Sequence, residues 1–370
     1  MYEVSKEIRL SSIVSNFQSI ADHVGKSIDI IPVIKADAYG HGALEVALKL
    51  SEFVNSYFAV ACTQEAIDLR KKNIKKDILV LSNAGFDDIE KLYDYNLTPV
   101  IHNFTILESI IEFSKSKKYR FPIHIKFNTG MNRLGFCQID LDKIFELYKK
   151  NKEYINIIGI MSHFLSSESD TNITNKQINE FEYIVNTIKF SDLDVRYYHI
   201  ANSGGVLNNK NAHFNAVRVG ISLYGYYPNK EEQNKIKLKP AMSIKSFILS
   251  KQKLKKGEGV SYGPSFVADN DMEIAIVAFG YADGLFRLLS NKFSVILNDK
   301  LCKSIGTICM DMFAIDVSGI KTNIGDEVII MGESKTCKVD ADDLAVFAST
   351  ISYEILTNIG KSSRVKRVYI

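Results

Sequence analysis

The chain has 370 residues, of which 46% are hydrophobic and 24% charged, and its formal net charge is +3. This composition is ordinary for a globular protein, and the length is sufficient for two domains. The small net charge gives no indication of a nucleic-acid partner. No uninterrupted apolar stretch approaches the roughly 20 residues of a membrane-spanning helix, so we expect no membrane association either.

The cysteines are five in number and scattered along the chain, and their spacing matches no metal-binding motif. We therefore expect no metal site. An odd number of scattered cysteines is typical of reduced thiols in the cytoplasm, where disulfides rarely persist. No secretory signal is visible in the first ten residues, so the sequence predicts a cytoplasmic protein.

Apolar runs rich in β-branched residues recur along the first 225 residues and predict eight strands. They lie near residues 28–34, 57–62, 78–81, 99–101, 123–127, 155–161, 195–200 and 216–223. Helical-period segments separate most of them. Strands that alternate with helices indicate parallel βα units, and eight such units favour a closed (β/α)8 barrel of the TIM type over an open sheet. We assign residues 1–240 to this barrel.

From about Ala241 the pattern changes to closely spaced strands with turn signals between them, such as Lys256-Gly257 and Asn298-Asp299. The predicted strands cover residues 243–254, 273–279, 293–297, 312–317 and 327–331. Helical segments are expected only after Asp340. The sequence thus predicts a mostly-β C-terminal domain over residues 241–370, and the fold class is α/β with this domain appended.

Lys35 directly follows the first apolar run and is expected to be partly buried. Burial disfavours the ammonium form of a lysine, so the free amine could attack an aldehyde near neutral pH. Tyr39 and the glycines of Tyr39-Gly-His-Gly42 supply a hydroxyl and a flexible turn that could hold a phosphate. A lysine at a strand end can equally extend its amine to solvent, and Lys35 alone does not decide between the two.

Barrel enzymes carry their chemistry on the loops that follow the strands, and the conspicuous polar residues lie there. Lys126, Asn128 and Arg133 follow the fifth strand, His163 follows the sixth, and Ser203 follows the seventh. The eighth strand carries Arg218, Gly220 and Ile221. The loops after strands seven and eight are the usual phosphate site of such barrels, and Ser203 with the Gly220 and Ile221 backbone offers the small donors that a phosphate needs.

These segments resemble alanine racemases in order and spacing over essentially the whole chain. The resemblance rests on the decapeptide Val-Ile-Lys-Ala-Asp-Ala-Tyr-Gly-His-Gly at 33–42, on the loops above, and on Ser261-Tyr262-Gly263, 280–284 and Cys309-Met310-Asp311. It implies a pyridoxal 5'-phosphate enzyme that racemises alanine and supplies D-alanine for peptidoglycan. It also implies a head-to-tail homodimer with shared active sites.

The resemblance further implies a role for each matching residue. Lys35 would hold the cofactor, Arg218 would face its pyridine nitrogen, and His163 would also bind it. Arg133, buttressed by Lys126, would contact the substrate carboxylate. The phosphate would be bound by Tyr39, Ser203, Gly220, Ile221 and Tyr353, and the partner subunit would contribute Tyr262, Met310 and Asp311.

Racemisation removes a proton from one face of the amino acid and returns one to the other, which requires two groups unless one base moves. We expect Lys35 and Tyr262 to be this pair. A phenol is a poor base at neutral pH unless positive charge favours phenolate, and His163 and the two arginines are the candidate sources. An arginine at the pyridine nitrogen leaves that nitrogen unprotonated and the cofactor a weaker electron sink, which favours racemisation over transamination.

Three departures from the family pattern leave alternatives open. Asn128 stands where an aspartate is more usual, and Thr307 and Glu168 replace residues of the access corridor. A racemase of serine, lysine or broad specificity therefore remains an alternative. The resemblance also implies that carbon dioxide converts Lys126 into a carbamate that orients Arg133. With Asn128 present, chloride beside an unmodified Lys126 ammonium is the alternative. A related decarboxylase would carry an acidic residue in place of Arg218, and a non-catalytic cofactor-binding protein would not need Tyr262.

Overall fold

The computed structural model describes residues 3–83 and 85–370. Their contacts group into two compact units. The barrel unit contains residues 14–38 and 42–238, and the sheet unit contains residues 3–13, 39–41 and 239–370. The predicted boundary between residues 240 and 241 is not decided by this grouping and stays a prediction.

Eight parallel strands of the barrel unit close on themselves, as the sequence predicted. Strands β3 to β8 pair in order and β2 pairs with β9. The bridge between Val33 and Ala59 joins β2 to β3, and the Arg218 amide donates to the Ala201 carbonyl between β9 and β8, at 2.9 Å. The strands are β2 (Asp29–Pro32), β3 (Tyr57–Cys62), β4 (Asp77–Asn83), β5 (Thr98–Ile101), β6 (Phe121–Lys126), β7 (Ile155–Met161), β8 (Tyr197–His199) and β9 (Ala216–Val219).

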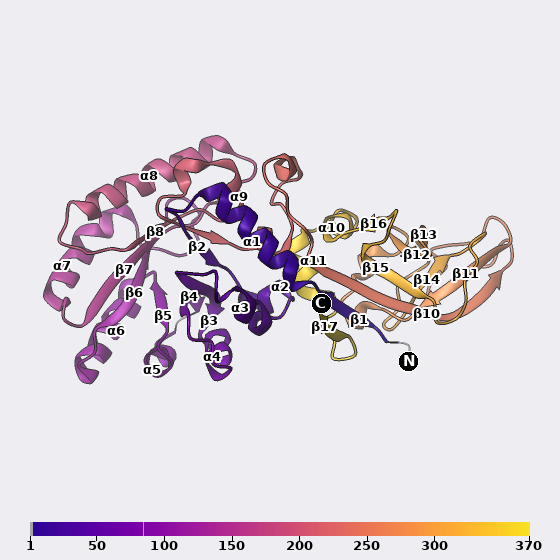
Figure 1. The fold of residues 1–370 in the computed structure, drawn as a ribbon, viewed down its shortest axis with the longest axis horizontal. Helices are drawn as coiled ribbons and strands as arrows, with labels where there is room; N and C mark the ends of the chain where they lie inside the picture. Colours follow the sequence, from indigo (N-terminus) through magenta and orange to yellow (C-terminus); the bar gives the residue numbers. More distant parts are fainter. Residues whose placement is uncertain (1–2, 84) are drawn as a thin grey trace. The chain divides into compact units, whose positions relative to one another are not determined.

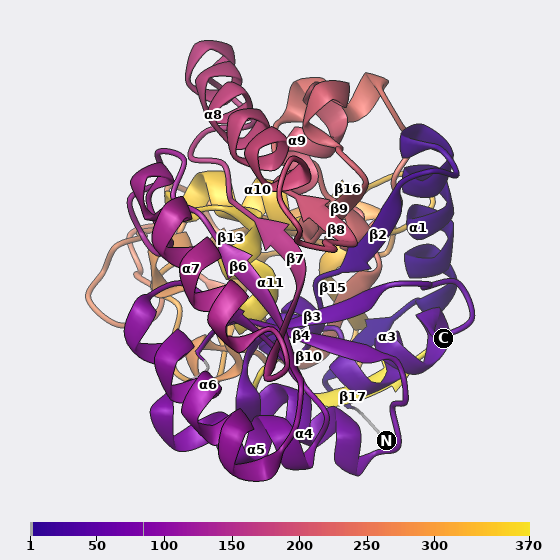
Figure 2. The same cartoon turned by 90° about the vertical axis from the view of Figure 1, so that its left-hand side faces the viewer.

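Helices cover the outside of these strands (Figure 2). Because both faces of the sheet are covered, its strands are continuous apolar runs rather than alternating ones. Helix α8 shows how the covering helices form, since the Asp170 side chain caps its first turn and its buried residues recur at helical spacing. The helices are α1 (Leu10–Val24), α2 (Lys35–Tyr39), α3 (Ala43–Leu50), α4 (Thr63–Lys71), α5 (Ile89–Asp94), α6 (Phe104–Lys117), α7 (Leu141–Asn151), α8 (Thr171–Lys189) and α9 (Ser203–Asn208).

The predicted strand at 216–223 is too long by four residues. The run at 216–223 forms a strand only as far as Val219, and a 3-10 turn (Ile221–Tyr224) follows, closed by Gly225 in a left-handed conformation. An apolar composition alone cannot separate a buried strand from a buried turn.

The sheet unit is mostly β, again as predicted. Its nine-stranded sheet has the order β16-β15-β12-β13-β14-β11-β10-β1-β17, and its C-terminal part runs from orange to yellow in Figure 1. The strands are β1 (Ser5–Ile8), β10 (Met242–Leu254), β11 (Met272–Val277), β12 (Ser294–Leu297), β13 (Lys300–Ile305), β14 (Phe313–Asp316), β15 (Glu327–Glu333), β16 (Lys338–Val339) and β17 (Lys366–Tyr369). Helices α10 (Ala341–Ala348) and α11 (Ser352–Asn358) follow Asp340.

Strands β1, β13, β16 and β17 were not predicted, because β1, β16 and β17 have at most four residues and lysines interrupt the apolar residues of β13. The turn signal at Asn298-Asp299 was correct, since both residues have positive φ and join β12 to β13 as a tight hairpin. No helix among the described residues has the length and apolar character needed to cross a membrane.

Candidate active site

Lys35 begins the short helix α2, three residues after the end of β2. The residues that follow it are unusual, because Ala36, Asp37 and Ala38 have φ values of 52°, 54° and 54° with ψ near 50°. Tyr39 continues the left-handed turn with φ 54°. None of the four is glycine, and a left-handed residue with a Cβ atom costs roughly 1–2 kcal/mol. Conformations of this kind persist only where the surroundings hold them.

Hydrogen bonds to side-chain carboxylates hold this turn. The Glu65 Oε1 atom accepts from the Ala36 amide at 2.7 Å, and its Oε2 atom accepts from the Ala61 amide at the same distance. The Asp37 Oδ1 atom accepts from the Ala43 amide at 2.9 Å. Bonds from backbone amides to charged acceptors contribute about 1.5–3 kcal/mol each, which is enough to offset most of the strain. Sequence reasoning missed Glu65, although its place in the first turn of α4 after the neighbouring strand was a usable signal.

Cations surround the amine of Lys35. Burial lowers its pKa, and the charges of Arg133 and Arg218 lower it further, whereas the charge of Glu65 raises it. The barrel thus brings together the lysine and the two arginines that the sequence singled out. A buried amine of lowered pKa carries more of the neutral, nucleophilic form near neutral pH.

Lys126 lies at the end of β6 in the same cluster and is buried. Burial and the charges of Arg218, Arg133 and Lys35 lower its pKa to about 8. Asn128 binds within its own loop, where its Oδ1 atom accepts from the Asn132 amide at 2.8 Å and its Nδ2 atom donates to the Asn132 side chain at 2.9 Å. Asn128 therefore shapes the loop that carries Arg133.

Arg218 is buried on β9, and its two terminal nitrogens make all of the contacts described for its side chain. They donate to the carbonyl oxygens of Ser162, His199 and Ile200 and to the Nδ1 atoms of His199 and His163. Burial lowers the pKa of Arg218 to about 9, so it stays protonated at neutral pH. Among the described residues, this arrangement leaves its Nε–H for a further acceptor.

The histidines beside Arg218 are neutral acceptors. Burial and the charges of Arg218 and other cations of the site lower the pKa of His163 well below its usual value. The expectation that His163 supplies positive charge is therefore wrong. His199 accepts from Arg218 at 2.7 Å, so its other nitrogen carries the proton and donates to His124 at 2.8 Å. Of the three candidate sources of positive charge, Arg133 and Arg218 remain.

The loops after β8 and β9 gather small hydroxyl and amide groups. The buried Ser203 hydroxyl accepts from the Gly220 amide at 3.2 Å and from the Ser222 amide at 3.4 Å, and Ile221 lies between these amides. The Ser222 hydroxyl is buried and finds no partner among the described residues. An unpartnered buried hydroxyl in a polar cradle fits a missing anion. Ser222 was not among the predicted site residues, although it directly follows the predicted site residue Ile221.

Tyr39 and Tyr353 lie together in the sheet unit, with ring centroids 6.0 Å apart. Burial raises the pKa of Tyr39, so its hydroxyl stays protonated and is able to donate. Gly40 next to it has φ 80°, and a Cβ atom there would lie 2.4 Å from the Leu356 carbonyl oxygen. A side chain at Gly40 would therefore collide with the helix that carries Tyr353.

Tyr262 lies on an exposed turn of the sheet unit and is itself 74% exposed. The preceding residue, Ser261, has φ 68°. Its hydroxyl donates to the Thr307 carbonyl at 2.5 Å and lies 3.2 Å from the Cys309 sulfur. The loop at 307–309 thus fixes the backbone that presents Tyr262. The Thr307 hydroxyl bonds to Ser265 instead.

Met310 and Asp311 follow on the same loop, and both are exposed. Arg364 donates to the Asp311 carboxylate at 2.6 Å and pairs with the buried Asp283 at 2.9 Å. The Asp283 carboxylate also accepts from the Gly280 amide at 3.0 Å. Arg364 therefore ties the loop of Met310 and Asp311 to the turn at 280–284.

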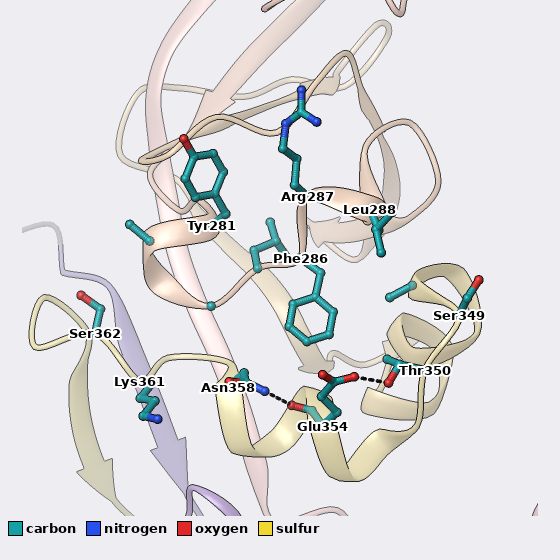
Figure 3. A pocket seen from close by; sticks show the side chains of 14 residues that line it. Tyr281, Phe286, Arg287, Leu288, Ser349, Thr350, Glu354, Asn358, Lys361 and Ser362 are labelled. Atoms are coloured by element: carbon teal, nitrogen blue, oxygen red, sulfur yellow. Dashed lines mark hydrogen bonds between the residues drawn. The ribbon is translucent and has the colours of Figure 1, made fainter.

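A cavity of 780 Å³ opens beside this turn (Figure 3). Tyr281, Arg287, Leu288 and Glu354 are among the residues that line it. Among the described residues, no group of three or more His, Cys, Asp and Glu side chains is placed to hold a metal ion.

Comparison with known proteins assigns the two parts of the chain. The models of the alanine racemase N-terminal and C-terminal domains match residues 8–228 and 241–369. The chain belongs to the alanine racemase family. Alanine racemase 1 of Clostridium acetobutylicum is 40% identical over 368 residues, which cover 98% of this chain and 94% of the relative. The predicted family, the fold class and the assignment to the isomerases are confirmed.

Solved alanine racemase structures have the same fold. That of Clostridium difficile 630 is 34% identical, with a TM-score of 0.92, and the match covers 100% of this chain and 96% of the other. That of Bartonella henselae, described with covalently bound pyridoxal phosphate, is 29% identical, with a TM-score of 0.89 and full coverage of both chains.

Proposed function

We propose that this alanine racemase interconverts L-alanine and D-alanine with pyridoxal 5'-phosphate bound to Lys35, and that it supplies D-alanine for peptidoglycan in the cytoplasm. The observation that carries the proposal is the partly buried lysine after a barrel strand, with its pKa lowered by burial and by two arginines. The relatives are named alanine racemases, which disfavours a racemase of serine, lysine or broad specificity. The free cysteines favour a reducing compartment.

The residues of the barrel unit fit the cofactor. Its phosphate would be held by Ser203, the Gly220 and Ile221 amides and the unpartnered Ser222 hydroxyl. Family resemblance alone adds the tyrosine pair Tyr39 and Tyr353, which lies in the sheet unit. The Nε–H of Arg218 would donate to the pyridine nitrogen. The bound cofactor supplies an aldehyde for attachment and an electron-withdrawing ring that acidifies the substrate α-proton.

Proton transfer falls to two side chains of this chain. The Lys35 Nζ atom would accept or return the proton on one face of the substrate, because its lowered pKa keeps a fraction of it neutral. The Tyr262 Oη atom of the partner subunit would do so on the other face. Family resemblance assigns Lys35 to D-alanine and Tyr262 to L-alanine.

The shared site requires a homodimer, and the exposed residues of the sheet unit support one. Tyr262 and Met310 are largely exposed in the single chain although both are expected at an active site. Large apolar side chains near the cavity are exposed as well, namely Leu288, Val346, Phe347 and Ile351. A second copy that covered these residues would bury the apolar surface and complete the pocket.

Arg133 would bind the substrate carboxylate. Lys126, converted into a carbamate, would orient the Arg133 side chain. With a pKa of about 8, roughly a tenth of Lys126 is neutral at pH 7, about 300 times more than for an ordinary lysine. The neutral Nζ atom would attack carbon dioxide, form a C–N bond and release a proton, and the resulting anion would accept from Arg133. Because Asn128 bonds within its own loop, it is a weak competitor as part of a chloride site.

The proposal is tested by incubating the protein and pyridoxal phosphate separately with L-alanine, L-serine and L-lysine and following optical rotation. We expect the optical rotation of the L-alanine solution to fall to zero, and to do so faster than that of the other two amino acids. Equal rates with all three would favour a broad-specificity racemase, and no change with any of them would overturn the proposal.

A further inference from the structure

We propose that Glu65 is a positioning residue for Lys35, and that its carboxylate fixes the left-handed turn on which the reacting amine is carried. The inference deepens the proposed function and rests on Lys35 as the reacting residue. Glu65 does not touch the substrate in this proposal. It acts through the backbone of Ala36, the residue next to Lys35, and through its charge.

The hydrogen bonds of Glu65 begin where the ladder between β2 and β3 stops. The Ile34 amide donates to the Ala59 carbonyl at 2.9 Å. In a continued parallel ladder, the Ala61 amide would next donate to Ile34 and the Ala36 amide to Ala61. The left-handed turn breaks this pattern, because the Ile34 carbonyl accepts from the Ala38 amide instead, at 2.9 Å.

The break leaves two neighbouring backbone amides without strand partners, and Glu65 binds both. One carboxylate oxygen takes Ala36 and the other takes Ala61, each at 2.7 Å. The carboxylate thus replaces the missing ladder position and ties the turn after Lys35 to β3. A carboxylate suits this place because it has two acceptor oxygens, whereas a carboxamide has one acceptor and would turn its NH2 group toward the other amide.

The charge of Glu65 also acts on Lys35. The groups that face the amine are Arg133 and Arg218, which lower its pKa, and Glu65, which raises it. Lys126 and His163 are also close enough to interact with Lys35, and His163 is neutral. The negative charge of Glu65 therefore partly offsets the effect of the arginines, and it keeps the pKa of Lys35 higher than it would be without Glu65.

The test measures Lys35 directly in the full chain, freed of cofactor with hydroxylamine. Competitive acetylation over a range of pH, read by mass spectrometry of the Lys35 peptide, gives its apparent pKa. We expect Glu65→Gln to lower this pKa by about one unit and Glu65→Asp, which keeps the charge, to leave it nearly unchanged. Asp68→Asn is the matched control, since Asp68 is an exposed carboxylate on the same helix that bonds Gln64, and it should change nothing.

A second readout reports the hydrogen bonds themselves. Amide hydrogen exchange of the Ala36 segment should be at least tenfold faster in Glu65→Gln and in Glu65→Asp than in the Asp68→Asn control. Parent-like Lys35 pKa and parent-like exchange in Glu65→Gln would overturn the proposal. If Glu65→Gln fails to fold, parent-like exchange in Glu65→Asp overturns it. Neither readout needs substrate or turnover, so failure here leaves the proposed racemisation standing, and an inactive parent would leave these values interpretable.

Discussion

Lys35 is the lysine at the end of β2 whose neutral form is favoured by burial and by Arg133 and Arg218. We predict that borohydride reduction of the cofactor-loaded protein will fix the cofactor on this residue. Peptide mapping should find the label at Lys35 and at no other lysine in more than trace amounts. A label elsewhere, or a protein that stays colourless after loading, would contradict the proposed function.

Tyr262 is expected to serve one face of the substrate only. Tyr262→Phe should therefore abolish racemisation but retain part of the α-proton exchange with D-alanine in heavy water, because Lys35 serves the other face. Proton NMR of the α-position measures both enantiomers in one experiment. Equal loss of exchange from L-alanine and D-alanine would refute the division of labour between the two bases, although not the racemase activity.

Lys126 should carry a carbamate whose formation follows its pKa of about 8. Only the neutral amine reacts, so at constant dissolved carbon dioxide the carbamate should increase as pH rises from about 6.5 to 8.5. The measurement is carbon-13 bicarbonate NMR of the parent and of Lys126→Ala. Degassing at low pH should remove the signal and the activity, and bicarbonate should restore both. A signal of equal size in the two proteins, or a response to halide exchange alone, would exclude the modification.

The left-handed turn and its neighbour Gly40 show what one local element demands of the sequence. Gly40→Ala should destabilise the protein by about 3 kcal/mol, because its Cβ atom would meet the Leu356 carbonyl oxygen at 2.4 Å. Gly25 is the matched control, since its φ is 87° but nothing lies within 4 Å of the added atom. Gly25→Ala should cost only about 1 kcal/mol. Thermal unfolding compares the two, and equal midpoints would show that the collision is relieved.

Much of the element structure could be predicted from the sequence. The residues of β3 and β7 were predicted to the residue, because continuous apolar runs between helical segments are typical of buried parallel strands. Strand β17 was missed because it is short and charged and pairs with β1, which is distant in sequence. Strand β13 was missed although its partner β12 is adjacent, because Lys300 and Lys303 interrupt its apolar residues. Ser222 and Glu65 were missed for a related reason. Their roles depend on a backbone turn that composition does not reveal, whereas Lys35, Arg218 and Tyr262 lie in motifs that resemble the family.

At the scale of the whole molecule, the proposed dimer makes each active site the product of two subunits. Unfolding and refolding Lys35→Ala together with Tyr262→Phe should give about half mixed dimers. Each mixed dimer has one intact site and one site with both defects, so about a quarter of the parent activity should return. Either variant refolded alone is the control. Proven mixing without any recovery would argue that Tyr262 acts on Lys35 of its own chain.

Strand β1 gives the molecule a further property. Its residues lie between β10 and β17 in the sheet, paired antiparallel with residues 242–245 and parallel with residues 366–369. The sheet unit is therefore discontinuous along the chain, and no single cut separates it from the barrel unit. A fragment that began at residue 241 would expose two unpaired backbone edges, which are templates for aggregation. A peptide of residues 3–9 has the length and register to fill that gap as an added strand, which would make the sheet unit soluble only as a two-piece complex.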